Sequence, residues 1–162
     1  MRINKANKAF YVWAAVSLAC MAAIFGFSAQ NAEQSSQLSG ALTDNTLAVI
    51  LRRIGIEIEE PLAEALEVFI RKTAHVFIYF ILGLCATNTF AQIIKEKRRL
   101  FVISLSFCSF YAATDELHQY FVPGRACMLQ DWLFDTIGSL LAVCAAVYVL
   151  RVRGTSVKDK AN

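Results

Sequence analysis

Charged residues and residues that interrupt helices are both scarce in this chain. Of its 162 residues, only 18% are charged, two are proline and seven are glycine. So few prolines and glycines exclude a collagen-like or linker-like protein of low complexity. The net charge of +3 is too small to indicate a nucleic-acid-binding protein, so we expect no nucleic acid among its partners.

Hydrophobic residues take the place of the missing charges. They make up 57% of the chain, and the mean hydropathy is +0.48. A soluble domain averages about 45–50% apolar residues. The composition therefore indicates a small membrane protein, and the length suits a single membrane domain over residues 1–162.

Long uncharged runs predict where the chain crosses the bilayer. A transmembrane helix needs about 20 mostly apolar residues. We place the four spans at about 9–30, 72–94, 100–120 and 131–150. A Pro-Gly pair at 123–124 is typical of a tight turn and makes the last two spans an antiparallel hairpin. The predicted fold is an all-α bundle of four transmembrane helices.

The last two spans are completed only by including charged residues. Their apolar runs, 100–114 and 136–150, are 15 residues each and reach about 22 Å, which is too short to span. The residues that complete them include Asp115 and Glu116 on one helix and Asp131 and Asp135 on the other. We therefore expect these carboxylates at similar depth, just inside one membrane face.

Lysine and arginine placement predicts the orientation. The N-terminal segment, residues 95–99 and the C-terminal tail hold 11 of the 16 basic residues. The positive-inside rule then places both termini in the cytoplasm and the carboxylates on the extracytoplasmic side. We interpret the first span as an uncleaved anchor, because its apolar run is long for a signal peptide.

The connection of about 31–71 is then extracytoplasmic and contains one or two short amphipathic helices. Apolar residues recur at helical spacing over 47–54, and a second helix beginning at Pro61 runs into the second span. The five cysteines form no disulfide framework, since four of them fall inside spans.

Polar and ionisable side chains gather at the outer ends of the last three spans. Charges at membrane depth are costly, so they normally pair, coordinate a ligand or line a wet cavity. The candidates for acid, base or orienting roles in catalysis are His75, Asp115, Glu116, His118, Asp131 and Asp135. The candidates for ligand binding are Arg71, Lys72, Tyr79, Gln119 and Arg125, with the two arginines as anion anchors. No metal is assigned because no HExxH-type spacing is present, and no cofactor is identified.

Three interpretations of this cluster stay open. It is a catalytic site, a non-catalytic recognition site, or a set of structural pairs in which Arg71 or Arg125 faces Asp131 or Asp135. We favour a functional site, because six or more ionisable groups exceed what helix registration needs.

Several blocks of this cluster resemble the VanZ-like family of bacterial membrane proteins. They are the Arg-Lys-Thr-Ala-His run at 71–75 followed by Tyr79, the run DELHQYFVPGR at 115–125, and Asp131 with Asp135 and Gly138. The Phe-Ser-Ala-Gln segment at 27–30 also looks like an early block of the family.

The resemblance implies a multi-pass protein of the bacterial cytoplasmic membrane. The family's named relative is associated with low-level resistance to the lipoglycopeptide teicoplanin, and the family has no settled reaction. We therefore expect an extracytoplasmic polar pocket that acts on an amphiphilic envelope molecule or lipoglycopeptide, with membrane lipids as further partners. The alternatives are an enzyme that modifies a lipid-linked intermediate and a structural or interaction protein.

Overall fold

The structure, a computed structural model, describes residues 5–31, 33–35, 37 and 60–159. No strand occurs in these residues, and the part of the chain they cover is built on four long helices. They are α1 (Lys5–Ser28), α4 (Glu60–Ala91), α5 (Lys97–Tyr120) and α6 (Leu129–Asp159). Each is long and apolar enough to cross a membrane, so the chain is an all-α membrane bundle, as predicted.

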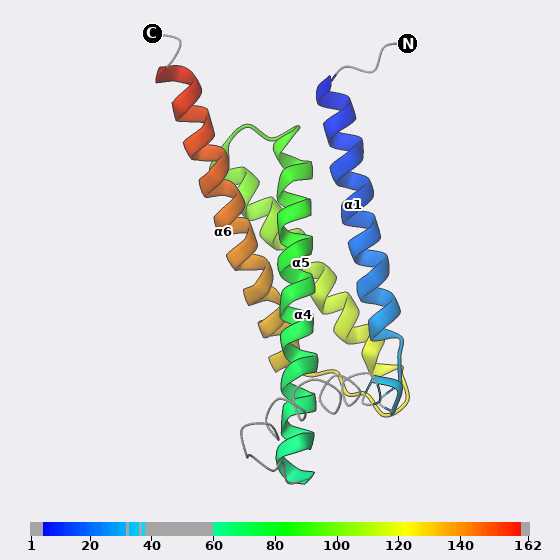
Figure 1. Ribbon diagram of the computed structural model, residues 1–162. Coiled ribbons are helices and arrows are strands. Elements are labelled where there is room, and N and C mark those ends of the chain that lie inside the picture. The colour runs from blue at the N-terminus through cyan, green and yellow to red at the C-terminus, as the bar shows by residue number, and fades with distance from the viewer. Residues whose placement is uncertain (1–4, 32, 36, 38–59, 160–162) are drawn as a thin grey trace.

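The helices alternate in direction along the chain. Figure 1 shows the start of α1, the α4–α5 connection and the last turns of α6 at one end of the bundle. The end of α1, the α5–α6 connection and the start of α4 lie at the other end. The predicted cluster of polar residues lies at the end formed by the end of α1, the start of α4 and the α5–α6 connection, so the two ends of the bundle differ chemically.

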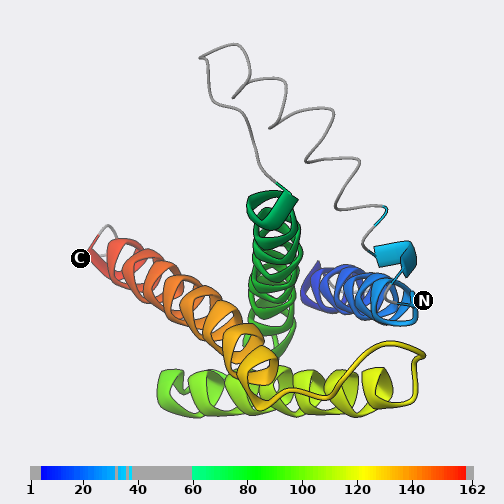
Figure 2. The same cartoon turned by 90° about the horizontal axis from the view of Figure 1, so that it is seen from below.

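Helix α4 is the centre of the bundle. Seen along its axis in Figure 2, it lies between α1 and α6 while α5 runs across one side, and it contacts all three. The core around it includes Tyr79, Leu82 and Ala86 of α4, Ile24 of α1 and Cys108 of α5.

The predicted amphipathic helix at Pro61 is the beginning of α4 itself. Proline is tolerated in the first turn of a helix, where its missing N–H would have no partner. At 32 residues α4 is about 48 Å long, which exceeds the roughly 30 Å of hydrocarbon. Its first turns accordingly project beyond the other helices in Figure 1. The other predicted amphipathic helix, 47–54, lies outside the described residues.

Helices α5 and α6 form the predicted hairpin. The Arg125 N–H donates to the Val122 carbonyl oxygen over 3.1 Å, and Gly124 has a φ of 75°. Proline followed by a glycine with positive φ is the arrangement of a type II turn. Farther along the pair, the Trp132 indole N–H donates to the Ser109 carbonyl oxygen over 3.0 Å. The turn directs Arg125 back toward the bundle.

Helix α1 is joined to α5 by polar bonds at two levels. The Tyr111 hydroxyl donates to the Met21 carbonyl oxygen over 2.7 Å. Near the end of α1, the Ser28 hydroxyl donates to Oδ2 of Asp115 over 2.8 Å. Hydrocarbon offers no water to replace such bonds, so they fix α1 against the bundle.

Candidate functional site

A small polar cavity lies between α4, α5, α6 and the α5–α6 connection. Its volume is about 30 Å³, enough for one or two water molecules or a bound ion. Its lining residues are Arg71, Lys72, His75, Glu116, Gln119, Arg125, Asp131, Phe134 and Asp135. Eight of these nine were predicted from the sequence, so the polar cluster is one site rather than scattered charges.

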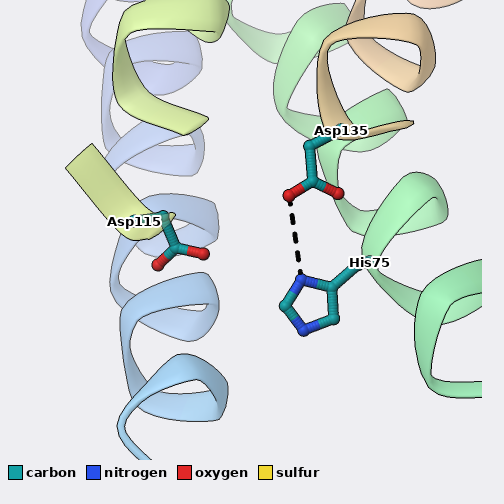
Figure 3. Close-up of side chains that lie close together, drawn as sticks. All are labelled: His75, Asp115 and Asp135. Carbon is teal, nitrogen blue, oxygen red and sulfur yellow. Dashed lines mark ion pairs between the residues drawn. The ribbon is translucent and has the colours of Figure 1, made fainter. Parts of the chain in front are cut away.

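His75, Asp115 and Asp135 converge from three different helices (Figure 3). Each offers one nitrogen or oxygen atom, and these three atoms all lie within 4.8 Å of one another. The carboxylates are deeply buried, with Asp115 3% and Asp135 1% exposed. The His75 Nδ1 atom lies 3.9 Å from Oδ2 of Asp135, which is an ionic separation and too long for a hydrogen bond.

The Asp115 carboxylate is held through only one of its two oxygens. Oδ2 accepts hydrogen bonds from the Ser28 hydroxyl at 2.8 Å and from Nε2 of Gln119 at 3.2 Å. Gln119 in turn accepts a hydrogen bond from Nη1 of Arg125 at 3.4 Å. Oδ1 of Asp115 is buried and has no hydrogen-bond partner among the described residues. Its neighbours therefore fix the orientation of Asp115 through Oδ2 and leave Oδ1 free of hydrogen bonds from the described residues.

Glu116 is as buried as Asp115, although the two point in directions about 100° apart on α5. Asp115 bonds to Ser28 of α1, whereas Glu116 bonds to the residue directly before α6, so each is covered by a different neighbour of α5. Oε2 of Glu116 accepts the backbone N–H of Met128 at 2.9 Å. A carboxylate at the start of a helix is stabilised by the free N–H groups there, so Glu116 caps α6 as well as lining the cavity.

Lys72 and Asp131 form an ion pair at the rim of the cavity. Both side chains are about one-third exposed, at 32% and 29%. The Lys72 ammonium also lies 5.7 Å from the ring centroid of Phe134, within the range of a cation–π interaction. The ion pairs that the described residues form at this site are Lys72–Asp131 and His75–Asp135, which differ from the arginine pairs expected from the sequence under the structural interpretation.

The two arginines are not paired with carboxylates in the described part of the chain. Arg125 donates from Nε to the Gln30 carbonyl oxygen at 3.2 Å and from Nη1 to Gln119. Burial, and then the like charge of nearby Arg71, lower the pKa of the Arg125 guanidinium from its ordinary value. An arginine stays protonated even so. Two positive charges therefore lie close together at the edge of the site.

Three of the predicted site residues do not line the cavity, namely Asp115, His118 and Tyr79. The His118 ring stacks on Phe25 of α1 with 4.4 Å between ring centroids. Tyr79 is fully buried in the core one turn along α4 from His75, and its hydroxyl has no hydrogen-bond partner in the described residues.

A second, mostly apolar pocket lies between α1 and α4 beside the polar cavity. Its volume is about 220 Å³. Ile24 and Phe27 of α1 and Ile70, Ala74 and Ile78 of α4 line its apolar part. Its polar edge consists of Gln30, Ser35, Arg71, His75 and Arg125, and the last three of these also line the polar cavity. The two spaces therefore share one wall of positive charge and imidazole.

The sequence also matches a known protein family. The family model described as VanZ/LLP1 matches residues 13–151. The chain belongs to the VanZ/LLP1 family. The match extends from α1 into α6 and confirms the resemblance seen in the sequence. No match was found among curated proteins or among solved structures.

The site of this VanZ/LLP1 protein contains two features that were not predicted from the sequence. Phe134 lines the polar cavity, and its position three residues after Asp131 on α6 was an available signal. The apolar pocket gave no comparable signal, because its residues belong to ordinary apolar runs of two helices. Chemically, the site offers guanidinium groups for an anion, carboxylates and an imidazole for a cation or proton, and an apolar space beside them.

Proposed function

We propose that this VanZ/LLP1 protein binds an amphiphilic molecule of the bacterial envelope. Its anionic headgroup lies between Arg71 and Arg125, and its apolar tail occupies the pocket between α1 and α4. The observation that carries this proposal is the shared wall, since Arg71, His75 and Arg125 line both the polar cavity and the apolar pocket. A ligand bound there needs a charged part and an apolar part side by side.

The arrangement of charges supports an anionic headgroup. Arg71 and Arg125 are close enough for their like charges to interact, and the described residues place no carboxylate in an ion pair with either. The nearby Asp131 is already paired with Lys72. Guanidinium groups bind phosphate and carboxylate through paired hydrogen bonds, so an anion between them relieves the repulsion and adds directed contacts.

We expect the apolar pocket to determine which tails fit more than how tightly the ligand binds. Inside a bilayer, a lipid tail gains little by leaving other tails for an equally apolar protein surface. The pocket formed by Ile24, Phe27 and Ile78 therefore selects by shape, while the headgroup contacts provide most of the binding energy. Affinity should accordingly follow the charge of the headgroup.

The location of the ligand follows from the proposed orientation. We place the chain in the bacterial cytoplasmic membrane with its basic ends in the cytoplasm, so that the site faces the outer leaflet. A lipoglycopeptide combines an acyl tail with an ionisable head and thus falls in the same chemical class as an anionic lipid. Binding of such a drug, or of its lipid-linked target, is the route by which we propose that the chain contributes to teicoplanin resistance.

The binding test compares two ligands with the same tail. Full-length protein in phosphatidylcholine nanodiscs is titrated with lysophosphatidic acid or with lysophosphatidylcholine, and bound ligand is counted by native mass spectrometry. We expect preference for lysophosphatidic acid and a loss of about 10- to 100-fold in its affinity in Arg71→Gln and Arg125→Gln, as expected for a charge-assisted hydrogen bond. Arg98→Gln, an exposed arginine at the opposite end, is the matched control. Equal affinity for both ligands would overturn the proposal.

The apolar pocket has its own variant pair. Ala74→Trp fills the pocket and should weaken binding of the long-tailed ligand, whereas Thr73→Trp places the same ring on a neighbouring exposed position outside the pocket lining. Equal loss in both variants would mean that the tail lies elsewhere.

Acid–base or metal-assisted chemistry on the bound molecule is the second candidate function. It is favoured by the half-buried His75 and the buried Asp115 and Asp135 beside the proposed headgroup site. Asp115→Asn separates the two candidates in a strain that depends on the chain for teicoplanin resistance. Resistance lost with binding retained indicates chemistry, whereas parallel loss of both indicates recognition alone.

A further inference from the structure

We propose that His75, Asp115 and Asp135 bind a divalent transition-metal ion, such as Zn²⁺ or Mn²⁺. No sequence motif points to this site, because each ligand comes from a different helix. The inference does not depend on an amphiphilic ligand, so the two proposals succeed or fail separately.

The first support is the separation of the three side chains. Two atoms bound to the same Zn²⁺ at about 2.0–2.2 Å lie at most about 4.4 Å apart. The 3.9 Å between His75 Nδ1 and Asp135 Oδ2 falls within this limit, although it is too long for a direct hydrogen bond. With one oxygen of Asp115 included, the three ligand atoms all lie within 4.8 Å of one another. Small side-chain rotations are enough to shorten the longest of these separations to the roughly 4.4 Å that a shared ion requires. Figure 3 shows all three side chains directed toward the same space.

The second and independent support is a pair of buried oxygens that nothing in the described residues satisfies. Within the part of the chain that the structure describes, Oδ1 of Asp115 and Oδ2 of Asp135 have no hydrogen-bond partner. The two residues are 3% and 1% exposed, respectively. Burying a carboxylate oxygen without a partner is costly. Lys72 pairs with Asp131, and Arg125 bonds to Gln30 and Gln119. The His75 Nδ1 atom comes no closer than 3.9 Å to Oδ2 of Asp135, which leaves that oxygen without a hydrogen bond from the described residues. A shared cation satisfies both oxygens at once.

The surroundings of Asp115 resemble the outer shell of a metal ligand. Metal-binding carboxylates are usually oriented by hydrogen bonds to the oxygen that does not bind the ion. The Ser28 hydroxyl and the Gln119 amide both donate to Oδ2, and Oδ1 has no hydrogen-bond partner among the described residues. The polar cavity, which His75 and Asp135 also line, leaves room for water or a ligand oxygen as a further donor to the ion.

The donor set indicates the class of ion. Imidazole favours Zn²⁺ and other transition metals, while Mg²⁺ and Ca²⁺ prefer sites made entirely of oxygen. One imidazole and two carboxylates also suit Mn²⁺. The cavity lining and Asp115 together contain four carboxylates and three lysine or arginine side chains, a formal net charge of −1. A bound divalent cation changes this net charge to +1. That charge would itself attract an anion.

The first test measures binding of the metal alone. Full-length protein in detergent is stripped with chelator, reloaded with Zn²⁺ or Mn²⁺ and analysed by mass spectrometry of the elements, with affinity obtained by competition against a metal indicator. We expect about one ion per chain, tighter than Mg²⁺ or Ca²⁺, and losses of more than about 100-fold in His75→Gln and Asp135→Asn. The matched controls, His118→Gln and Asp131→Asn, change the same residue types outside the triad and should retain the ion. No stoichiometric ion in the unsubstituted chain, or equal loss in the controls, would overturn the inference.

The second test stays informative if the glutamine or asparagine variants fold poorly. Asp135→Cys replaces an oxygen ligand by a thiolate, which coordinates Co²⁺ and produces a thiolate-to-metal charge-transfer band. We expect the band on adding Co²⁺ to Asp135→Cys and not to the unsubstituted chain or to Asp131→Cys. The band appearing equally in Asp131→Cys would place the ion outside the triad.

Discussion

Gly138 of α6 lies directly against the backbone carbonyl oxygen of Val76 on α4, where a Cβ atom would overlap that oxygen. Val76 follows His75 in the chain, and Asp135 precedes Gly138 by about one helical turn. Farther along the same two helices, a Cβ atom on Gly83 would lie 2.8 Å from Cβ of Ala142. Small residues thus let the backbones of α4 and α6 approach closely. This approach sets the distance between His75 and Asp135.

Replacing Gly138 should therefore damage the bundle and the site together. We expect Gly138→Ala to destabilise the protein by about 1–3 kcal/mol, because the added methyl group overlaps backbone that cannot rotate away. Thermal unfolding followed by tryptophan fluorescence measures the effect, with a fall in Tm of at least about 2 °C. Gly26→Ala on α1 is the control, since nothing lies within 4 Å of its added Cβ. A Gly138→Ala protein as stable as the Gly26→Ala protein would refute the close contact.

The hydrogen bond from Ser28 makes α1 part of the proposed ion site. Ser28→Ala removes the 2.8 Å bond to Asp115 and should lower metal affinity about 10- to 100-fold without removing a ligand. Ser17→Ala deletes a hydroxyl that bonds to the Trp13 carbonyl oxygen and faces Thr89, remote from Asp115 in sequence and in hydrogen bonding. The metal affinities of the two variants are measured by competition with a metal indicator and compared. Equal affinities would show that Ser28 does not orient the carboxylate.

The Lys72–Asp131 pair should contribute little to stability. Both side chains are about one-third exposed, and solvent screens such pairs. A double-mutant cycle of Lys72→Gln and Asp131→Asn should give a coupling energy of no more than about 1 kcal/mol. Chemical unfolding of the four proteins supplies the values. A coupling of several kcal/mol would mean that the pair is desolvated and holds the helices in register.

Cys127 reports which side of the membrane the site faces. It is an exposed, free cysteine in the connection between α5 and α6, at the same end as the polar cavity. A maleimide that does not cross membranes should label it in intact cells if this end is extracytoplasmic. Cys127→Ser should abolish the labelling, and permeabilised cells give the maximum signal. Labelling that requires permeabilisation would reverse the proposed orientation.

The sequence predicted much of the fold because hydropathy and helix length are local properties. The span ending at residue 120 and the helix beginning near Pro61 agree with α5 and α4 to within a residue. The shortness of the apolar runs predicted that the carboxylates of the last two spans share one level near a membrane face, and Asp115 and Asp135 do lie close together at one end of the bundle. These inferences need only a helix rise and a membrane thickness.

The contacts within the site could not be predicted, because they depend on how the helices cross and not on the sequence of any one helix. Glu116 is buried because α6 covers the side of α5 that carries it. His75, Asp115 and Asp135 meet only because Gly138 permits close contact of α4 and α6 while Ser28 fastens α1 beside α5. The pairing of Lys72 rather than an arginine with Asp131 is equally a matter of side-chain placement.

The bonds from Tyr111 to Met21 and from Ser28 to Asp115 have a consequence for how a ligand reaches the apolar pocket. These two hydrogen bonds hold α1 against α5 at Met21 and at Ser28, so we expect α1 to stay in place when a ligand binds. Phe27 and Ala74, on either side of the pocket, are themselves exposed on the flank of the bundle. If the proposed function holds, a tailed ligand would enter sideways from the surrounding leaflet, with its head at the level of the arginines.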